Sequence, residues 1–267
     1  MSNSKLVFLQ VANVAAFVVT VLVNSLANAL ALNGRSTGEI SDLYPTLVTP
    51  AGYVFAIWGL IYVLLLIFAV FQALPKRKEE LFLRKIGFLF VLSCVFNILW
   101  LFAWHYGQIT LSALPMFSLL ATLVGIYLRL DVGRSEVSLK EKACVRWPFS
   151  VYLGWITIAS IANVAAALVS TGWDGWGISA LSWVALVIIA VLVINLVVIV
   201  TRKDIPYSLV IIWALVGIVV KQSGNQTIFT IGVVGIAIIA IALILVNIVA
   251  KLQVHNSQHV STERQES

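Results

Sequence analysis

Charged residues are scarce in this chain of 267 residues: Asp, Glu, Lys and Arg make up 10%, against about 25% in soluble globular proteins. Hydrophobic residues supply 61%, which excludes an ordinary water-soluble enzyme and a disordered protein. The two cysteines, Cys94 and Cys144, include no C-x-x-C pair, so neither a disulfide framework nor a zinc site is expected. The 16 glycines and 6 prolines are too few for a collagen-like or linker-rich chain. The composition predicts a polytopic membrane protein.

Charge-free windows give the number of membrane spans, because a span needs roughly 20 apolar residues. One window, residues 86–128, is long enough for two spans separated by the polar bend 105–108. We therefore expect an all-α membrane bundle of eight transmembrane helices. The seventh is the shortest and requires Lys221 to extend its ammonium group to the headgroups. The windows are 6–34, 43–75, 86–128, 147–173, 175–201, 205–220 and 222–250.

Basic residues predict the orientation, because Lys and Arg accumulate in short cytoplasmic loops. With eight spans, fifteen of the 17 Lys and Arg residues fall on the side of both termini, and only Arg35 and Lys221 fall on the other. We expect a multi-pass protein of the cytoplasmic membrane with both termini in the cytoplasm. Topology thus explains the net charge of +6, and no nucleic-acid partner is expected. Residues 251–267 are polar, and we expect a disordered tail there.

The first hydrophobic segment has two interpretations. Lys5, an apolar run and the Ala-x-Ala pattern within residues 27–31 resemble a signal peptide with its cleavage site. The apolar run over residues 6–32 is long for a signal peptide, however, which favours a helix retained in the mature protein.

No charged residue lies at the middle of any predicted span, which limits the function. Ion-coupled transporters and proton pumps use such groups to bind the coupling ion or proton. Paired carboxylates, a Ser/His/Asp set and a glycine-rich phosphate loop are missing as well, so we expect no enzyme activity. His105, at the end of the third span, fits a hydrogen-bonded bend residue better than a haem ligand.

Amide and hydroxyl side chains line one face of the first span. Five of them fall within an arc of about 80° at 100° per residue, namely Gln10, Asn13, Thr20, Asn24 and Asn28. Unpaired donors in lipid cost several kcal/mol, so this face must contact other helices or a wet cavity. The two interpretations are interhelical hydrogen bonding and the lining of an uncoupled pathway for a small polar solute.

Three further spans each carry a face that combines large aromatic rings with amide or small side chains. Rings at helical spacing commonly serve helix packing, but three such helices together can form an apolar pocket with few polar anchors, as in many small-molecule sites. Indole and phenol rings also stack well on a flat conjugated ligand. The predicted ligand-binding residues are Phe55, Trp58, Tyr62, Asn97, Trp100, Trp104, Tyr152, Trp155, Ala159 and Asn163, with Asn24 and Asn28 from the first span.

Three of these segments resemble the TspO/MBR family of translocator and tryptophan-rich sensory proteins. The second helix of that family has a proline eight residues before a W-x-x-x-Y pair, as Pro50, Trp58 and Tyr62 stand here. Residues 97–100 resemble its third helix and residues 151–163 its fifth. The resemblance covers about residues 6–170 of this chain.

The resemblance implies a five-helix membrane fold that binds porphyrins, sterol-like lipids or flat aromatic drugs beneath the loop after the first helix, here residues 33–49. A haem or porphyrin is then a candidate ligand for sensing or transport, and no cofactor is required. The expected partners are the lipid bilayer and a hydrophobic small molecule, and a homodimer is left open. Breakdown of a bound tetrapyrrole and a purely structural role as a membrane partner subunit also stay open as alternatives.

The resemblance divides the chain into a TspO-like domain over residues 1–173, three additional spans over residues 174–250 and the polar tail. The additional spans contain a weak repeat, because the seven-residue distance from Pro148 to Trp155 recurs between Pro206 and Trp213. The repeat reflects either chance or duplication of a helix pair. Duplication would let Trp213 contribute to a second or enlarged cavity.

Overall fold

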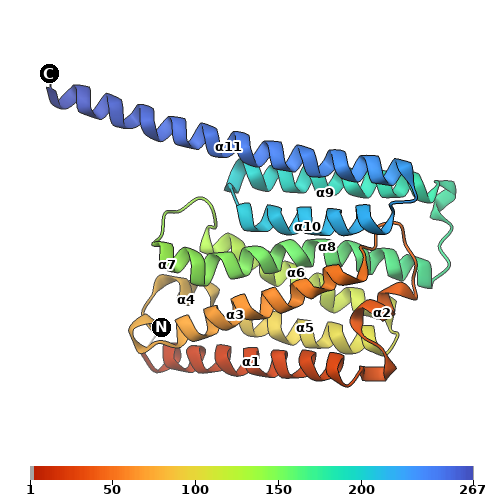
Figure 1. Cartoon of the computed structure of the whole chain (residues 1–267). Coiled ribbons are helices and arrows are strands. Elements are labelled where there is room, and N and C mark those ends of the chain that lie inside the picture. Colours follow the sequence, from red (N-terminus) through yellow and green to blue (C-terminus); the bar gives the residue numbers. More distant parts are fainter. Residues whose placement is uncertain (1–2, 267) are drawn as a thin grey trace.

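The computed structural model describes residues 3–266, and these residues form helices and the loops that connect them. The predicted all-α class is therefore confirmed. The long helices run roughly alongside one another (Figure 1). They are α1 (Asn3–Ala29), α3 (Ile57–Ala73), α5 (Leu89–His105), α6 (Ile109–Leu130), α8 (Trp147–Ser170), α9 (Ala180–Arg202), α10 (Ile205–Lys221) and α11 (Gln226–Glu266).

Six helical segments are long and apolar enough to cross a membrane, which agrees with a multi-pass membrane protein. The apolar helices α5 and α10 are shorter, with 17 residues each. Such a helix is about 25 Å long, at the lower limit for the hydrocarbon core. The count of eight spans therefore stays a prediction for these two helices.

Short helical segments occupy the connections between the long helices. α2 and η2 lie in the loop after α1, and α4 precedes α5, from which Gly87 separates it with a φ of +53°. The π-helical segment η4 leads into α8. The short segments are η1 (Leu32–Gly34), α2 (Thr37–Asp42), η2 (Gly52–Ala56), η3 (Pro75–Arg77), α4 (Leu81–Ile86), α7 (Leu139–Glu141), η4 (Lys142–Arg146) and η5 (Gly175–Gly177).

Helix α8 lies in the middle of the molecule (Figure 1). It packs against α3 and α6 on one side and against α10 on the other, while α9 and α11 pack with α10 to form a further layer. Gly154 permits the close α8–α10 contact, since a Cβ at this position would lie 3.0 Å from the Tyr207 carbonyl oxygen. α8 therefore joins the N-terminal helices to α10, on which α9 and α11 pack.

The first and last helices begin and end at the same end of the bundle (Figure 1). This end also carries the basic loops after α3, α6 and α9, so the charge asymmetry seen in the sequence is also an asymmetry of the fold. At residues 251–266, where the sequence predicts a disordered tail, the structure continues α11 as a helix. No Gly or Pro follows Gly235 to end that helix.

Candidate functional site

Trp58 lies at the centre of a cluster of aromatic rings from α3, α5 and α8. Its ring stacks on Tyr62 and on Trp100, with centroid distances of 5.7 and 5.9 Å. The rings of Tyr152 and Trp155 meet it edge-on, at 6.1 and 6.2 Å. Helical spacing produces this arrangement, because residues four apart, such as Trp58 and Tyr62, share one face of a helix. Three sequence-distant aromatic faces thus converge as the sequence predicts.

A small cavity of about 20 Å³ lies against this cluster, with room for about one water molecule. Seven of the predicted residues line it, namely Phe55, Trp58, Trp100, Trp104, Trp155, Ala159 and Asn163. Ser41, Pro50, Ile158 and Ala162 complete its wall. No Asp, Glu, Lys, Arg, His or Cys is among these lining residues, so the cavity offers stacking surfaces and one amide rather than acid–base chemistry.

Asn163 is the polar anchor of the cavity and ties three helices together. Its Oδ1 accepts a hydrogen bond of 2.9 Å from Trp100 Nε1. Its Nδ2 donates to Ser112 Oγ at 2.9 Å, and this hydroxyl donates to the Ile109 carbonyl oxygen at 2.6 Å. The amide therefore fixes the plane of the Trp100 indole, which forms part of the cavity wall.

A second amide network lies beside the ring cluster. Asn24 Nδ2 donates to Asn97 Oδ1 at 2.8 Å, and Asn97 Nδ2 donates to Tyr152 Oη at 3.1 Å. These three predicted residues are buried and connect α1, α5 and α8 without lining the cavity. Asn28 lies outside this network, because its side chain is exposed and donates to the Asn24 carbonyl oxygen at 2.9 Å.

Two of the five polar side chains on this face of α1, Gln10 and Asn24, bond to neighbouring helices. Gln10 donates to the Gln72 carbonyl oxygen, and Gln72 Nε2 donates back to the Gln10 carbonyl oxygen at 3.1 Å. Thr20 Oγ1 donates within its own helix, to the Ala16 carbonyl oxygen. Gln10 and Asn24 thus match interhelical hydrogen bonding, whereas Asn13 is fully buried and its amide forms no hydrogen bond with the described residues.

Residues 33–49 connect α1 to the segment that contains η2, and their helix α2 supplies Ser41 to the cavity wall. α2 begins with a capping box, in which Ser36 Oγ accepts from the Glu39 backbone N–H and Glu39 Oε2 accepts from the Ser36 N–H. The hydrogen bonds from the Ser36 backbone and hydroxyl lower the pKa of Glu39. The cap gives this segment a defined start and thereby places Ser41. We call residues 33–49 the lid.

The end of α5 holds the lid in place. Trp104 Nε1 donates to the Thr37 carbonyl oxygen at 3.2 Å. His105 is buried, with Nδ1 donating to the Leu32 carbonyl oxygen at 3.0 Å and Nε2 bonding to Thr37 Oγ1 at 3.2 Å. Both ring nitrogens are therefore engaged, as expected for a hydrogen-bonded bend residue. Among the residues described, no cluster of three His, Cys, Asp or Glu side chains is placed to hold a metal ion.

Helix α10 contacts the lid and the segment that follows it. Lys221 Nζ forms an ion pair with Asp42 Oδ1 of the lid at 2.7 Å. The sequence predicts instead that this ammonium group extends to the lipid headgroups. The Ala51 backbone N–H donates to the Gly217 carbonyl oxygen, and Trp213 Nε1 donates to the Val54 carbonyl oxygen, both at 3.1 Å. The C-terminal helices are thus part of the structure around the cavity.

The family profile described as TSPO-like protein matches residues 10–249 of this chain. The chain belongs to the TSPO-like family. No curated protein and no solved structure gives a significant match. The matched region reaches beyond residues 6–170, where the motifs are recognisable, and includes α9, α10 and the first part of α11. In this TSPO-like protein the three C-terminal helices therefore lie within the family match.

Sequence reasoning missed part of the cavity wall in this TSPO-like protein. Ile158 and Ala162 lie one residue before Ala159 and Asn163 on the same face of α8, so helical spacing could have identified them. Ser41 carries no such signal, because its position depends on how the lid folds over α5. Ser112 was missed for a similar reason, since its partner Asn163 is on another helix.

Proposed function

We propose that this TSPO-like protein binds a planar hydrophobic ligand, of the porphyrin, haem or sterol-like class, for sensing or transport. The observation that carries the proposal is the convergence of Trp58, Trp100 and Trp155 from three helices around one cavity beneath the lid. Stacked and edge-on rings present both flat faces and edges to a conjugated ring system. Membership of the TSPO-like family supports the same class of ligand.

Binding requires the site to open. Ligand pockets for drug-sized molecules occupy about 300–1,000 Å³, whereas the cavity holds about 20 Å³. A flat ligand fits by inserting between Trp58 and Trp100, whose rings now stack on each other at 5.9 Å. The ring–ring contact is then replaced by two ring–ligand contacts, and the lid has to move away from Trp104.

The proposal is binding without covalent chemistry. The cavity wall has Ser41 and Asn163 as its polar side chains, and neither lies beside an acid or base within that wall. A bound protoporphyrin should therefore keep its absorption spectrum under light and oxygen. Time-dependent bleaching that requires the folded protein would instead support breakdown of the tetrapyrrole.

The binding test is a titration of the purified protein with protoporphyrin IX, read by quenching of tryptophan fluorescence. We expect saturable quenching and an affinity about tenfold weaker in Trp58→Leu and in Trp155→Leu, because each loses one aromatic contact. Trp176→Leu is the matched control, since Trp176 is 75% exposed and lies outside the cavity wall. Equal affinities for all three variants and the wild type would refute the proposal.

A further inference from the structure

A larger hollow lies between α3 and α10, with the start of α8 as its floor. Its volume is about 1140 Å³. At one end, α10 is joined to η2 by the hydrogen bond from Trp213 to Val54. From that end α3 inclines away from α10, so the gap between the two helices widens toward the basic loops (Figure 1). We call this hollow the α3–α10 cleft.

The walls of the α3–α10 cleft are apolar along the two helices. Leu60 and Leu64 line it from α3, and Leu209 and Trp213 line it from α10. Leu60 is 52% exposed and Leu209 is 53% exposed, so neither is covered by another part of the described protein. These walls suit hydrocarbon chains that enter sideways from a bilayer.

The wide end of the cleft is basic. Five basic side chains line it, Arg134, Lys142, Arg146, Arg202 and Lys203, against two acidic ones, Glu136 and Asp204. Arg202 is paired with Asp131 at 3.0 Å, and Arg146 lies 3.8 Å from Glu141. Among the described side chains, Arg134, Lys142 and Lys203 form no ion pair within 4.0 Å, although Lys142 interacts electrostatically with Asp204. The lining therefore keeps an excess of cations for an anionic group.

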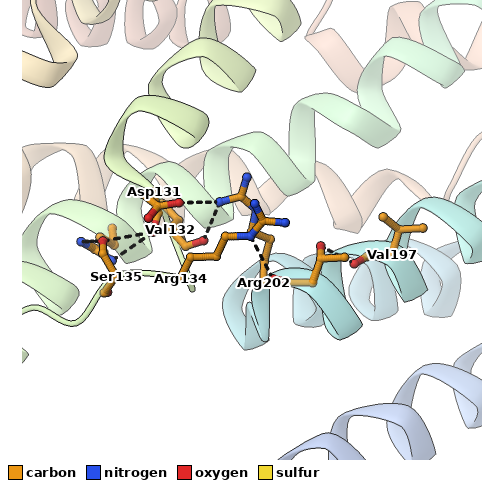
Figure 2. Close-up of polar contacts among 8 residues, drawn as sticks. Asp131, Val132, Arg134, Ser135, Val197 and Arg202 are labelled. Carbon is orange, nitrogen blue, oxygen red and sulfur yellow. Dashed lines mark hydrogen bonds and ion pairs between the residues drawn. The ribbon is translucent and has the colours of Figure 1, made fainter.

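This basic end is held together by reciprocal contacts between the loop after α6 and the end of α9. Arg202 Nη1 donates to the Val132 carbonyl oxygen and Arg134 Nε donates to the Thr201 carbonyl oxygen, each at 3.4 Å (Figure 2). Between them, Gly133 has a φ of +78°, and a Cβ there would lie 1.6 Å from the Arg202 carbonyl oxygen. We call these two hydrogen bonds, together with the close approach of Gly133 to Arg202, the clamp at Gly133. The clamp fixes the position from which Arg134 lines the cleft.

The inner wall of the cleft carries a cluster of buried polar groups. Ser150 is fully buried and Asp204 is 4% exposed, and both line the cleft. The hydroxyls of Ser150 and Tyr127 interact with the Asp204 carboxylate and oppose the rise in its pKa that burial causes. The polar part of the inner wall therefore lies beside Lys203, at the basic end of the cleft.

We propose that the α3–α10 cleft binds an anionic phospholipid from the bilayer. The phosphate lies among Arg134, Lys142 and Lys203, and the acyl chains run along Leu60 and Leu209 toward Trp213. The combination of a laterally exposed apolar wall with unpaired cations at one end matches the two halves of such a lipid. The site is distinct from the aromatic cavity, because no residue lines both.

The first test uses lipids with brominated acyl chains, which quench nearby tryptophans, in nanodiscs of phosphatidylcholine. Brominated phosphatidylglycerol should quench more strongly than brominated phosphatidylcholine, because only the former is attracted by the basic end. This excess should fall in Trp213→Phe, which leaves Trp147 as the other tryptophan of the cleft, and should be unchanged in Trp176→Phe. Equal quenching by the two lipids in the wild type, or the same excess in Trp213→Phe as in the wild type, would overturn the proposal.

The second test removes charge. Lys142→Gln combined with Lys203→Gln should weaken phosphatidylglycerol binding about 30-fold, since each lysine near an anionic headgroup contributes about fivefold. Lys76→Gln combined with Lys78→Gln is the matched control, with the same charge change at the same end of the bundle but outside the cleft. Equal weakening in both pairs would indicate diffuse attraction and overturn the assignment.

Inorganic phosphate distinguishes a lipid from a free anion. We expect phosphate alone to produce no thermal shift and to leave the excess quenching by phosphatidylglycerol in place. If phosphate stabilises the wild type, and the lysine pair abolishes that stabilisation, the site takes a free anion and the lipid proposal fails. The comparison of the two lipids on wild-type protein stands even if the lysine variant does not fold.

Discussion

The aromatic cavity and the α3–α10 cleft are lined by different residues of α3 and α8 and differ in volume and charge. The cavity has no charged lining residue and a volume of about 20 Å³. The cleft is laterally open, ends in basic side chains and has a volume of about 1140 Å³. Trp155, Ala159 and Asn163 face the cavity, whereas Trp147 and Ser150 face the cleft.

The comparison shows how one helix serves two kinds of site. A cavity smaller than the proposed ligand makes binding depend on movement of the protein, and its buried wall residues also contribute to stability. The cleft is already large and, under our proposal, takes up a lipid without opening, so its wall residues should contribute less to folding. The contacts that shape the cleft, above all the clamp at Gly133, are the exception. The following four substitutions test this division, from the largest expected effect to the smallest.

Gly133→Ala should damage the cleft most. The new Cβ would collide with the Arg202 carbonyl oxygen at 1.6 Å, and the φ of +78° is unfavourable for alanine. We expect a loss of about 3 kcal/mol or more in the free energy of unfolding, measured by thermal or chemical denaturation in detergent. Gly172→Ala is the control, because Gly172 has a φ of +68° with nothing within 4 Å, and it should cost about 1 kcal/mol. Similar losses in the two variants would argue against the clamp.

Asn163→Leu should destabilise the closed cavity by about 1–2 kcal/mol, because Trp100 Nε1 and Ser112 lose their partner. Asn195 on α9 provides the matched substitution. It is fully buried, and neither of its amide atoms has a hydrogen-bond partner within the described residues, so Asn195→Leu should be neutral or stabilising. Denaturation midpoints of the two variants decide the question, and a larger loss for Asn195→Leu would contradict the assignment of Asn163 as an anchor.

Asp204→Asn should change how stability depends on pH. Burial raises the pKa of Asp204, and the Ser150 hydroxyl only partly opposes this effect. The folded state therefore binds this proton more tightly than the unfolded state, so the associated stability is complete below the ordinary carboxyl pKa of about 3.9 and is lost as pH rises through the raised pKa. Asparagine keeps an oxygen to cap α10 at the Tyr207 N–H.

The expected outcome for Asp204→Asn is a higher melting temperature than the wild type at neutral pH. The difference should shrink as the pH falls toward about 4, where the wild-type carboxyl is protonated as well. Melting curves across this range measure it. A constant difference at every pH would mean that the charge of Asp204 has no part in the effect.

Lys221→Gln should have the smallest effect on stability. Its ion pair with Asp42 is partly exposed, and such pairs contribute about 0.2–1 kcal/mol. Because the pair holds the lid, the association rate of protoporphyrin should nevertheless increase, as measured by stopped-flow fluorescence. Arg77→Gln removes a comparable exposed pair, Arg77–Glu80, at the far end of the bundle and should leave that rate unchanged. Equal rates for both variants and the wild type would show that this contact does not limit access.

Much of the aromatic site could be predicted from the sequence because it depends on helical spacing. Trp58 and Tyr62, or Ala159 and Asn163, share a face wherever their helices are placed, so burial of those faces brings them toward a common centre. Helical spacing alone does not predict the surroundings of Asn28. It lies on the same stripe as Asn24, but only one of the two is deep enough in the bundle to meet α5.

The α3–α10 cleft could not be predicted in this way. Its shape depends on the inclination of α3 relative to α10, and its charges come from loops whose positions are set by the clamp at Gly133. Duplication of a helix pair, one of the two interpretations of the repeat ending in Trp213, would allow a second or enlarged cavity, but it gave no reason to join Trp213 with Lys142 or Lys203. Basic loops carry a topological signal in any membrane protein, so their composition alone does not indicate the lipid binding that we propose for the same residues.

Helix α10 connects the two hollows mechanically. It forms one wall of the cleft. Through Gly217, Trp213 and Lys221 it also contacts the lid and the segment that follows the lid. A molecule that displaces α10 from the side of the cleft would therefore also change the mobility of the lid. Thermodynamic reciprocity then requires that each occupant change the affinity of the other by the same factor. If both proposed sites are occupied in this way, the lipid composition of the bilayer would regulate ligand access to the aromatic cavity, which the lipid does not touch.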